Sequence, residues 1–363
     1  MSFDPTKPYD TLPPLPPKAD VETPAILKQC LTASRALAEL KGAGGLIPNQ
    51  SILINAIPLQ EAQASSEIEN ILTTEDALFR AAVDDGKTTD PQTKEVLRYR
   101  KALRHGFETV KERSFAVSVL REVCSILRDE SVDFRQAGQD VLIGNPRNRE
   151  IRYAPPRGGP LIQEKLTNLE TYLTAPEGPD PLIRMAVGHY QFEAIHPFTD
   201  GNGRTGRILN ILYLIEQGLL ELPVLYLSRY LIQHKNDYYR RLLEVSTRQA
   251  WEPWILYILK GIEETATSTR EMVQAIRQLL EETLEKVRTD LPKVYSKELV
   301  ELLFHQPYTK IAFLVDAGIA KRQTAATYLQ SLEAIGVLGS ETVGRERLFI
   351  NTALLELLKK GNA

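Results

Sequence analysis

Apolar residues recur along most of this chain at the three- and four-residue spacing of an α-helix. The first such segment, 23–41, opens with Thr23 and Pro24, a capping residue followed by a proline at the first helical position. The Gly-Ala-Gly-Gly run that follows is expected to end it, and a second element begins within residues 46–57 after a Pro-Asn turn. The pattern predicts further helices over residues 59–71, twice within 92–130, and over 164–174, 181–195, 204–218, 236–246 and 251–288. Residues 222–230 are predicted to be a short apolar link. Because the other segments of this pattern are helical, the core is predicted to be all-α.

Residues 146–163 interrupt the helical pattern. Ile151 and Tyr153 alternate with Arg152, and two prolines and two glycines then turn the chain. We predict a short β-hairpin with an open edge. It is either a plain surface loop or a flap that pairs with an extended segment of another protein by β-augmentation, and we favour the flap.

The C-terminal part, residues 291–363, has a different pattern. Helices are predicted over 296–304, 311–316 and 321–334, followed by a β-hairpin over 339–350 with Gly344 at its tip. This is the order of a winged helix-turn-helix domain. Lys321, Arg322 and Gln323 open the third helix, as DNA binding would require. Nine basic against seven acidic residues give a weak field for phosphate binding, so protein docking is favoured over DNA.

Residues 1–22 form a proline-rich arm, with four prolines between Pro13 and Pro17. Leu12 and Leu15 supply apolar anchors, which favours an arm packed on the chain's own helices over a ligand for a proline-binding domain. The predicted organisation is therefore this arm, a helical domain over 23–290 and the unit over 291–363.

Composition narrows the class of protein without naming an activity. The chain has 363 residues, 43% hydrophobic and 25% charged, with a net charge of −3. This balance gives no global attraction to nucleic acid or to an acidic membrane surface. Two distant cysteines, Cys30 and Cys124, fit buried free thiols. The sequence shows no signal peptide and no long apolar run, so a cytoplasmic location without membrane contact is expected.

The candidate chemistry lies in one stretch, HPFTDGNGRTGR, from His196 to Arg207. Nearly all of its residues are poor core material. Its glycines precede the helix predicted over 204–218, and free N–H groups at a helix start favour an anion. Two arginines in the first turn are unfavourable for the helix dipole unless something negative binds there. This stretch predicts a phosphate site with a histidine base beside it and a metal-binding carboxylate, Asp200, inside it.

A competing motif overlaps this stretch, because Gly201, Gly203 and Gly206 also satisfy G-x-G-x-x-G. That dinucleotide fingerprint requires a preceding β-strand. Here residues 182–195 have helical spacing and no β-branched run, so we reject the fingerprint.

The stretch resembles the signature of the Fic family, H-x-F-x-[DE]-G-N-G-R-x-x-R, and matches it at every defined position. The resemblance extends over roughly residues 5–290. It implies a helical enzyme that moves AMP from ATP to a Tyr, Thr or Ser hydroxyl of a protein, with the chain itself among the candidate acceptors. The implied roles are a general base for His196 and Mg²⁺ binding for Asp200. For the remaining positions, the resemblance implies binding of the ATP phosphates by Gly201, Asn202, Gly203, Arg204, Gly206 and Arg207.

Two other segments resemble parts of the same family. Ser65 and Glu69 lie one turn apart on the predicted helix 59–71. Alone they fit a solvated polar face, but Ser65-x-x-x-Glu69-Asn70 resembles the inhibitory motif [ST]-x-x-x-E-[GN]. This predicts that Glu69 pairs with Arg207 and keeps it from ATP. The run from Ile151 through Arg152 and Tyr153 to two prolines resembles the Fic flap.

Three functional hypotheses follow from the sequence. The first is a protein adenylyltransferase that is restrained by Glu69. The second is a de-AMPylase, in which Glu69 orients a water and AMP is removed from a modified protein. The third is a DNA-binding regulator whose helical domain only senses nucleotide. A homo-oligomer is possible in each.

Overall fold

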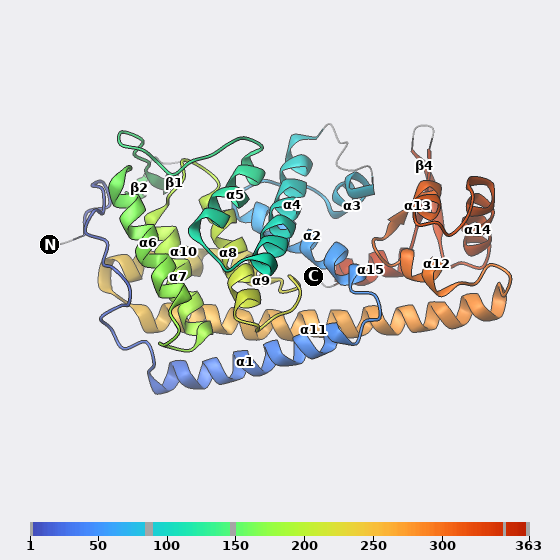
Figure 1. Cartoon of the computed structure of the whole chain (residues 1–363), viewed down its shortest axis with the longest axis horizontal. Helices are drawn as coiled ribbons and strands as arrows, with labels where there is room; N and C mark the ends of the chain where they lie inside the picture. Colours follow the sequence, from blue (N-terminus) through green and yellow to red (C-terminus); the bar gives the residue numbers. More distant parts are fainter. Residues whose placement is uncertain (1–2, 84–89, 146–149, 344–345, 361–363) are drawn as a thin grey trace.

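The computed structural model describes residues 3–83, 90–145, 150–343 and 346–360. It is mostly helical, with one two-stranded and one three-stranded antiparallel sheet (Figure 1). The elements up to residue 290 are α1 (Pro24–Gly45), α2 (Ser51–Ile68), α3 (Glu75–Val83), α4 (Pro91–Glu112), α5 (Val117–Arg128), β1 (Ile143–Asn145), β2 (Glu150–Tyr153), α6 (Pro160–Thr174), α7 (Pro181–Ile195), α8 (Asn202–Glu216), α9 (Leu227–Gln233), α10 (Lys235–Arg248) and α11 (Trp251–Asp290). The predicted helical class is confirmed.

The 40-residue helix α11 runs through the lower part of the molecule in Figure 1, and α1 lies against it from below. The side chain of Thr23 accepts a hydrogen bond from the Ile26 amide, the cap that the sequence predicts. The predicted end of α1 is wrong, because the helix continues through the glycine run to Gly45. A helical glycine costs only about 1 kcal/mol, and here Ala43 and Gly44 are buried against the core.

Helix α2 also differs from the prediction. It is one helix from Ser51, with Pro58 inside it, and it ends at Ile68 rather than at residue 71. Its apolar residues are buried on all sides, so tertiary packing offsets the hydrogen bond that proline removes. Glu61, buried in the same helix, accepts hydrogen bonds from the Ser228 amide (2.9 Å) and the Tyr99 hydroxyl (3.0 Å). These contacts hold α2 between α4 and α9.

Helices α7 and α8 form the centre of the molecule, and nearly every residue of both is buried. The apolar link predicted over 222–230 is wrong in part, because α9 begins at Leu227. Seven residues are too few to show a helical period clearly in sequence. Helix α3 was not predicted either.

The hairpin begins earlier than predicted. Its first strand is β1, which pairs antiparallel with β2 so that Ile143 lies opposite Tyr153 and Gly144 opposite Ile151. The predicted start at residue 146 falls in 146–149, outside the described residues.

The N-terminal arm packs on the chain's own helices, as predicted. Leu12 and Leu15 are buried. Lys165 of α6 donates to the Leu12 carbonyl (2.8 Å), and Asn168 hydrogen-bonds both the N–H and the carbonyl of Leu15.

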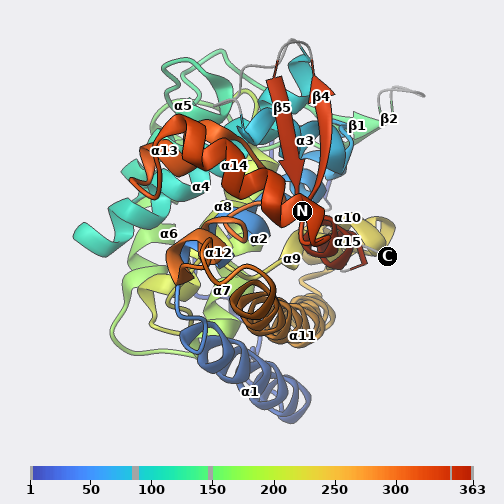
Figure 2. The ribbon, with the colours of Figure 1, turned by 90° about the vertical axis from the view of Figure 1, so that its right-hand side faces the viewer.

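The C-terminal unit is a small helical domain around a three-stranded sheet (Figure 2). Its elements are α12 (Lys297–Leu302), β3 (Tyr308–Thr309), α13 (Ile311–Asp316), α14 (Arg322–Ala334), β4 (Gly339–Val343), β5 (Glu346–Ile350) and α15 (Thr352–Lys360). The strand order is β3-β5-β4. The three helices and the hairpin β4–β5 match the predicted segments, whereas β3 and α15 were not predicted. The hairpin tip at Gly344 lies outside the described residues.

This unit contacts the helices that precede the signature. Tyr308 of β3 donates to Asp76 of α3, and Arg80 of α3 pairs with Glu341 of β4. Gln60 of α2 donates to the Leu358 carbonyl of α15 (2.8 Å). The unit over 291–363 therefore packs directly against α2 and α3. None of the described helices is long and apolar enough to cross a membrane.

Candidate active site

Residues 196–207, the signature loop, connect α7 to α8. His196 ends α7 in the left-handed conformation (φ 50°, ψ 61°), with its amide bonded to the Phe192 carbonyl (3.0 Å). Its Nδ1 is buried and has no hydrogen-bond partner among the described residues. Burial, and then the positive charge of Arg135, lower the pKa of His196 to about 4. The imidazole is therefore neutral near pH 7, the form that can accept a proton.

Asn202 closes the signature loop. Its Oδ1 accepts from the Phe198 amide and its Nδ2 donates to the Phe198 carbonyl, both at 2.8 Å. The side chain thus holds the turn of the signature loop with one acceptor and one donor. The phosphate contact expected of Asn202 stays a prediction.

The start of α8 is open toward an anion. Gly201 precedes the helix with φ 86°, a conformation that favours glycine, and no side chain among the described residues caps the helix. The first-turn N–H groups have no intrahelical acceptor. A Cβ at Gly203 would lie 2.3 Å from Glu69 Oε1, so only glycine permits this approach. The Glu69 carboxylate therefore lies at the place where the sequence predicts a phosphate.

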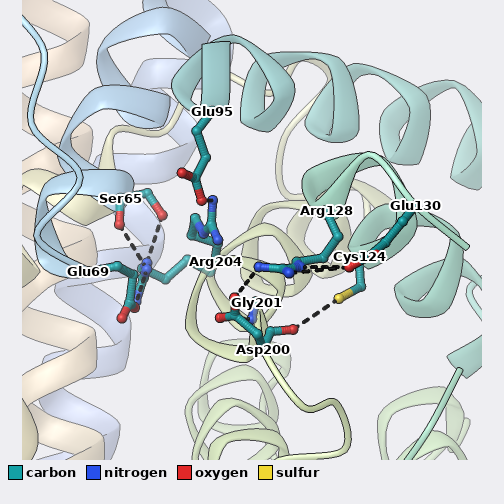
Figure 3. Close-up of polar contacts among 10 residues, drawn as sticks. Ser65, Glu69, Glu95, Cys124, Arg128, Glu130, Asp200, Gly201 and Arg204 are labelled. Carbon is teal, nitrogen blue, oxygen red and sulfur yellow. Dashed lines mark hydrogen bonds and ion pairs between the residues drawn. The ribbon is translucent and has the colours of Figure 1, made fainter. Parts of the chain in front are cut away.

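Arg207 makes the contact that the inhibitory motif predicts, with Glu69 and Ser65, which are both labelled in Figure 3. Its Nη2 lies 2.8 Å from Glu69 Oε1, its Nε donates to the Ser65 hydroxyl (2.7 Å), and Nη2 also donates to the Ser65 carbonyl (2.8 Å). The Arg207 side chain is 2% exposed, whereas that of Glu69 is 35% exposed. Every donor used in these contacts is unavailable to another anion.

The residue after Glu69 explains why the motif ends in Asn or Gly. Asn70 has φ 64°, in the left-handed region. Its amide donates to the Glu67 carbonyl, and the Ile71 amide donates to the Ser66 carbonyl. This pair of bonds is a Schellman C-cap, which only Gly and Asn adopt readily. It ends α2 so that the Glu69 side chain turns toward α8.

Two ion pairs at the site were not predicted from the sequence (Figure 3). Arg204 is 3% exposed and pairs with Glu95 of α4 (2.7 Å). Asp200 pairs with Arg128, at the end of α5. An acidic or basic residue on a helix is usually a solvated surface residue, so the sequence does not distinguish Glu95 or Arg128 from other charged residues. Both predicted ligand groups are thus engaged with protein partners.

The sequence also missed Arg135, which holds the backbone of His196 in place. It is fully buried and donates to the carbonyls of His196 (2.8 Å), Ile195 (3.1 Å) and Pro156 (2.8 Å). These bonds join the signature loop to the segment that follows the β-hairpin. Loss of Arg135 would free both.

Gly206 has a packing role. A Cβ there would lie 2.4 Å from Glu193 Oε1, so the glycine makes room for a carboxyl group on α7. Burial raises the pKa of Glu193 to about 7, although Arg207 opposes the shift. The glycine therefore permits close packing against α7, and its predicted phosphate contact stays a prediction.

Asp200 is the candidate residue for a divalent cation at this site. No group of three His, Cys, Asp or Glu that could hold a metal occurs in the described part of the chain. Asp200 offers one half-exposed carboxylate, with Oδ1 taken by the Gly201 amide (2.6 Å). Mg²⁺ typically uses one or two carboxylates plus substrate phosphates. Asp200 meets that requirement once Arg128 releases it.

The hairpin of β1 and β2 is anchored close to His196. The Tyr153 hydroxyl donates to the Ala194 carbonyl (2.8 Å), two residues before His196, and its ring is buried. Ile151 and Arg152 precede it on β2 and are more exposed. The Tyr153 side chain thus fixes the hairpin next to His196, and the predicted docking role of Ile151, Arg152 and Tyr153 stays a prediction.

Sequence models of three protein families match consecutive parts of the chain. They are Fic/DOC family N-terminal over residues 27–108, Fic/DOC family over 115–214, and Protein adenylyltransferase SoFic-like, C-terminal domain, over 279–354. Together they cover most of the chain and divide it near the start of the C-terminal unit.

Curated relatives are similar over shorter stretches. Protein adenylyltransferase Fic of Aedes aegypti is 27% identical over 219 residues, which are 56% of this chain and 40% of the relative. Protein adenylyltransferase fic-1 of Caenorhabditis briggsae is 36% identical over 84 residues, 23% of this chain and 15% of the relative. The chain thus matches less than half the length of these relatives.

Solved structures show the same fold. A Fic family protein from Desulfovibrio desulfuricans G20 superposes with a TM-score of 0.57 at 19% identity, covering 93% of this chain and 98% of that one. Fic-1 of C. elegans (residues 134–508) superposes with a TM-score of 0.51, also at 19% identity, covering 69% and 74%.

Proposed function

Because the chain belongs to the Fic/DOC family, we propose that it is a protein adenylyltransferase that moves AMP from ATP to a Tyr, Thr or Ser hydroxyl of a protein. The observation that carries this proposal is the neutral imidazole of His196, whose Nδ1 is buried, in one loop with an uncapped helix start and two arginines. A base, an anion site and fixed cations within twelve residues suit phosphoryl chemistry, which depends on positioning and electrostatics.

In the proposed reaction, His196 accepts the proton of the acceptor hydroxyl as its oxygen attacks the α-phosphorus of ATP. The new O–P bond forms while the bond to pyrophosphate breaks, and pyrophosphate leaves with its electron pair. The N–H groups at the start of α8 bind phosphate oxygens. Arg207 binds the outer phosphates after Glu69 releases it. Asp200 would hold Mg²⁺, which neutralises phosphate charge when bound.

Arg204 keeps a different place in this mechanism from the one predicted. Because it is buried and paired with Glu95, its positive charge is largely balanced by that carboxylate, and direct contact with a phosphate requires the pair to open. The pair ties α4 to the site.

We further propose that Glu69 restrains the reaction. Its carboxylate pairs with Arg207 and lies next to the Gly203 backbone, so ATP phosphates must displace it or bind in another pose. The hairpin over β1 and β2 is proposed to hold the target segment, with Ile151 and Arg152 on its accessible part. Its edge can add a strand from the target, and the Tyr153 anchor sets its height over His196.

The test is intact mass spectrometry after incubation with ATP and Mg²⁺, on the protein alone and with cell lysate. A mass gain equal to one AMP on the chain or on a lysate protein supports the transferase. Release of AMP from a previously modified target, without any gain from ATP, would instead identify the reverse reaction. The third hypothesis, a DNA-binding regulator, requires a salt-dependent mobility shift together with no turnover of ATP.

A further inference from the structure

A cavity of about 610 Å³ lies between α2 and α4, outside the signature loop. Its walls come mainly from Ile54, Asn55 and Pro58 of α2 and from one face of α4, which lies beside α2 (Figure 1). This volume is in the range of small-molecule sites.

The cavity is strongly basic in a chain of net negative charge. Five cationic side chains line it against the single carboxylate of Asp129. Arg98 pairs with Asp129 (3.3 Å), and Arg104 pairs with Glu108 on its own helix (3.0 Å). Lys94 and Lys101 are exposed, and no ion pair is found for them within the described ranges. A concave site lined by one sign of charge concentrates ligands of the opposite sign.

Apart from Asn55, the rest of the lining is apolar. Pro58, Leu103, Phe107 and Pro223 form part of the wall. The cations from Lys94 to Arg104 extend over roughly 15 Å of α4. A ligand that combines several phosphates with a flat, weakly polar ring system matches both the cations and the apolar wall. Phosphates bind Arg and Lys, and a nucleobase packs on an apolar or guanidinium surface.

The cavity lies at the weak point of α2. Proline has no N–H, so the carbonyl of Ile54 lacks the bond that residue 58 would normally donate. Both residues line the cavity. The part of α2 beyond Pro58 carries Ser65 and leads to Glu69, roughly 16 Å further along the helix. A ligand here thus contacts the interruption in the helix that positions the carboxylate against Arg207.

We propose that this cavity binds a nucleoside polyphosphate at a site separate from the ATP site of the signature loop, and that the bound ligand braces α2, which means that it holds α2 in place against α4. This bracing keeps Glu69 paired with Arg207 and so strengthens the inhibition of AMP transfer by Glu69. Its effect on AMP transfer rests on the proposed function, whereas binding and bracing do not.

The binding test is calorimetric titration with GTP. The cavity variant is Lys94→Ala/Lys101→Ala, and its control is Lys28→Ala/Lys286→Ala, which removes the same charge from exposed positions of α1 and α11. We expect the cavity variant to weaken GTP binding at least ~10-fold, the loss of about one charge-assisted contact, with the control unchanged. Arg207→Ala should retain this binding event. Equal weakening in both double variants, or loss only in Arg207→Ala, would overturn the site. Tighter binding of an oligonucleotide than of GTP would overturn the ligand class.

The bracing test is hydrogen exchange of the amides in residues 59–69. GTP should slow their exchange in the wild type and leave it unchanged in the cavity variant. Unchanged or faster exchange with GTP bound would refute bracing. Because this readout needs no catalysis, it decides the inference even if Glu69→Gly incorporates no AMP, an outcome that would count against the proposed function alone. Where AMP is incorporated, GTP should lower incorporation by the wild type and not by the cavity variant.

Discussion

Replacing Glu69 with glycine should raise AMP transfer while it lowers stability. The substitution removes the carboxylate that pairs with Arg207 at 2.8 Å and that lies against Gly203. Arg207 keeps its two bonds to Ser65 but becomes free to bind phosphate with its remaining donors. A structural ion pair would show only the loss of stability, so the opposite signs of the two changes are diagnostic.

The structure sets the expected magnitude. Removing one partner of a buried ion pair costs about 3–5 kcal/mol. Glu69 is 35% exposed and Arg207 retains Ser65, so we expect a lower cost of about 1–3 kcal/mol. If ATP must overcome a similar free energy to displace Glu69, its removal raises transfer by roughly 5- to 150-fold.

The assay is AMP incorporation at matched protein, ATP and Mg²⁺ concentrations, with the free energy of unfolding measured by urea denaturation. Glu67→Gly is the control, since it removes the same charge and introduces a glycine two residues earlier, in the last turn of α2, without an ion pair to Arg207. It should lose stability without a gain in transfer. An equal rise in both variants, or no rise in a folded Glu69→Gly, would refute restraint by Glu69.

Three further predictions test separate parts of the site. His196→Ala should lower transfer by ~10²–10⁴-fold and leave ATP binding by calorimetry nearly unchanged, because the imidazole acts on the acceptor hydroxyl; near-normal transfer would remove His196 from the mechanism. Ile151→Pro should spare ATP binding and impair modification of a protein target, because proline cannot donate to an added strand; unchanged target modification would contradict the flap. Burial raises the pKa of Glu61 to about 7 from 4.5, so its contribution to stability is full below pH 4.5 and is lost as pH rises through 7. The free energy of unfolding of wild type relative to Glu61→Gln should therefore fall by up to ~3 kcal/mol between pH 4.5 and 7.5, and a flat difference in urea denaturation would contradict the raised pKa.

Much of the site could be predicted because its chemistry is compressed into short motifs. The spacing of Ser65 and Glu69 matches one helical turn, and the structure has both on Arg207. The glycines of the signature loop were predicted from their conformational freedom, but Gly203 and Gly206 are needed for the close approach of Glu69 and Glu193. Those neighbours come from other helices, so the sequence around the glycines carries no trace of them.

The errors of the sequence prediction have a common physical cause, which is that the deciding contacts come from residues far away along the chain. Glu95, Arg128 and Arg135 act on the signature loop from segments 60 to 110 residues away, and charged residues on helices usually face solvent. Pro58 is expected to break a helix, yet burial of α2 on all sides keeps the helix whole. The short elements β3 and α9 depend on neighbours that the local pattern does not reveal.

The most direct test of the account compares Glu69→Gly with Glu69→Gly/His196→Ala by intact mass after incubation with ATP, Mg²⁺ and a lysate. We predict an AMP gain, on the chain or on a lysate protein, for the first and none for the second, with both folded by circular dichroism. The difference isolates transfer by His196 in a site freed from Glu69. An AMP gain in both proteins would contradict the role of the histidine, and no gain in either would contradict adenylyl transfer itself.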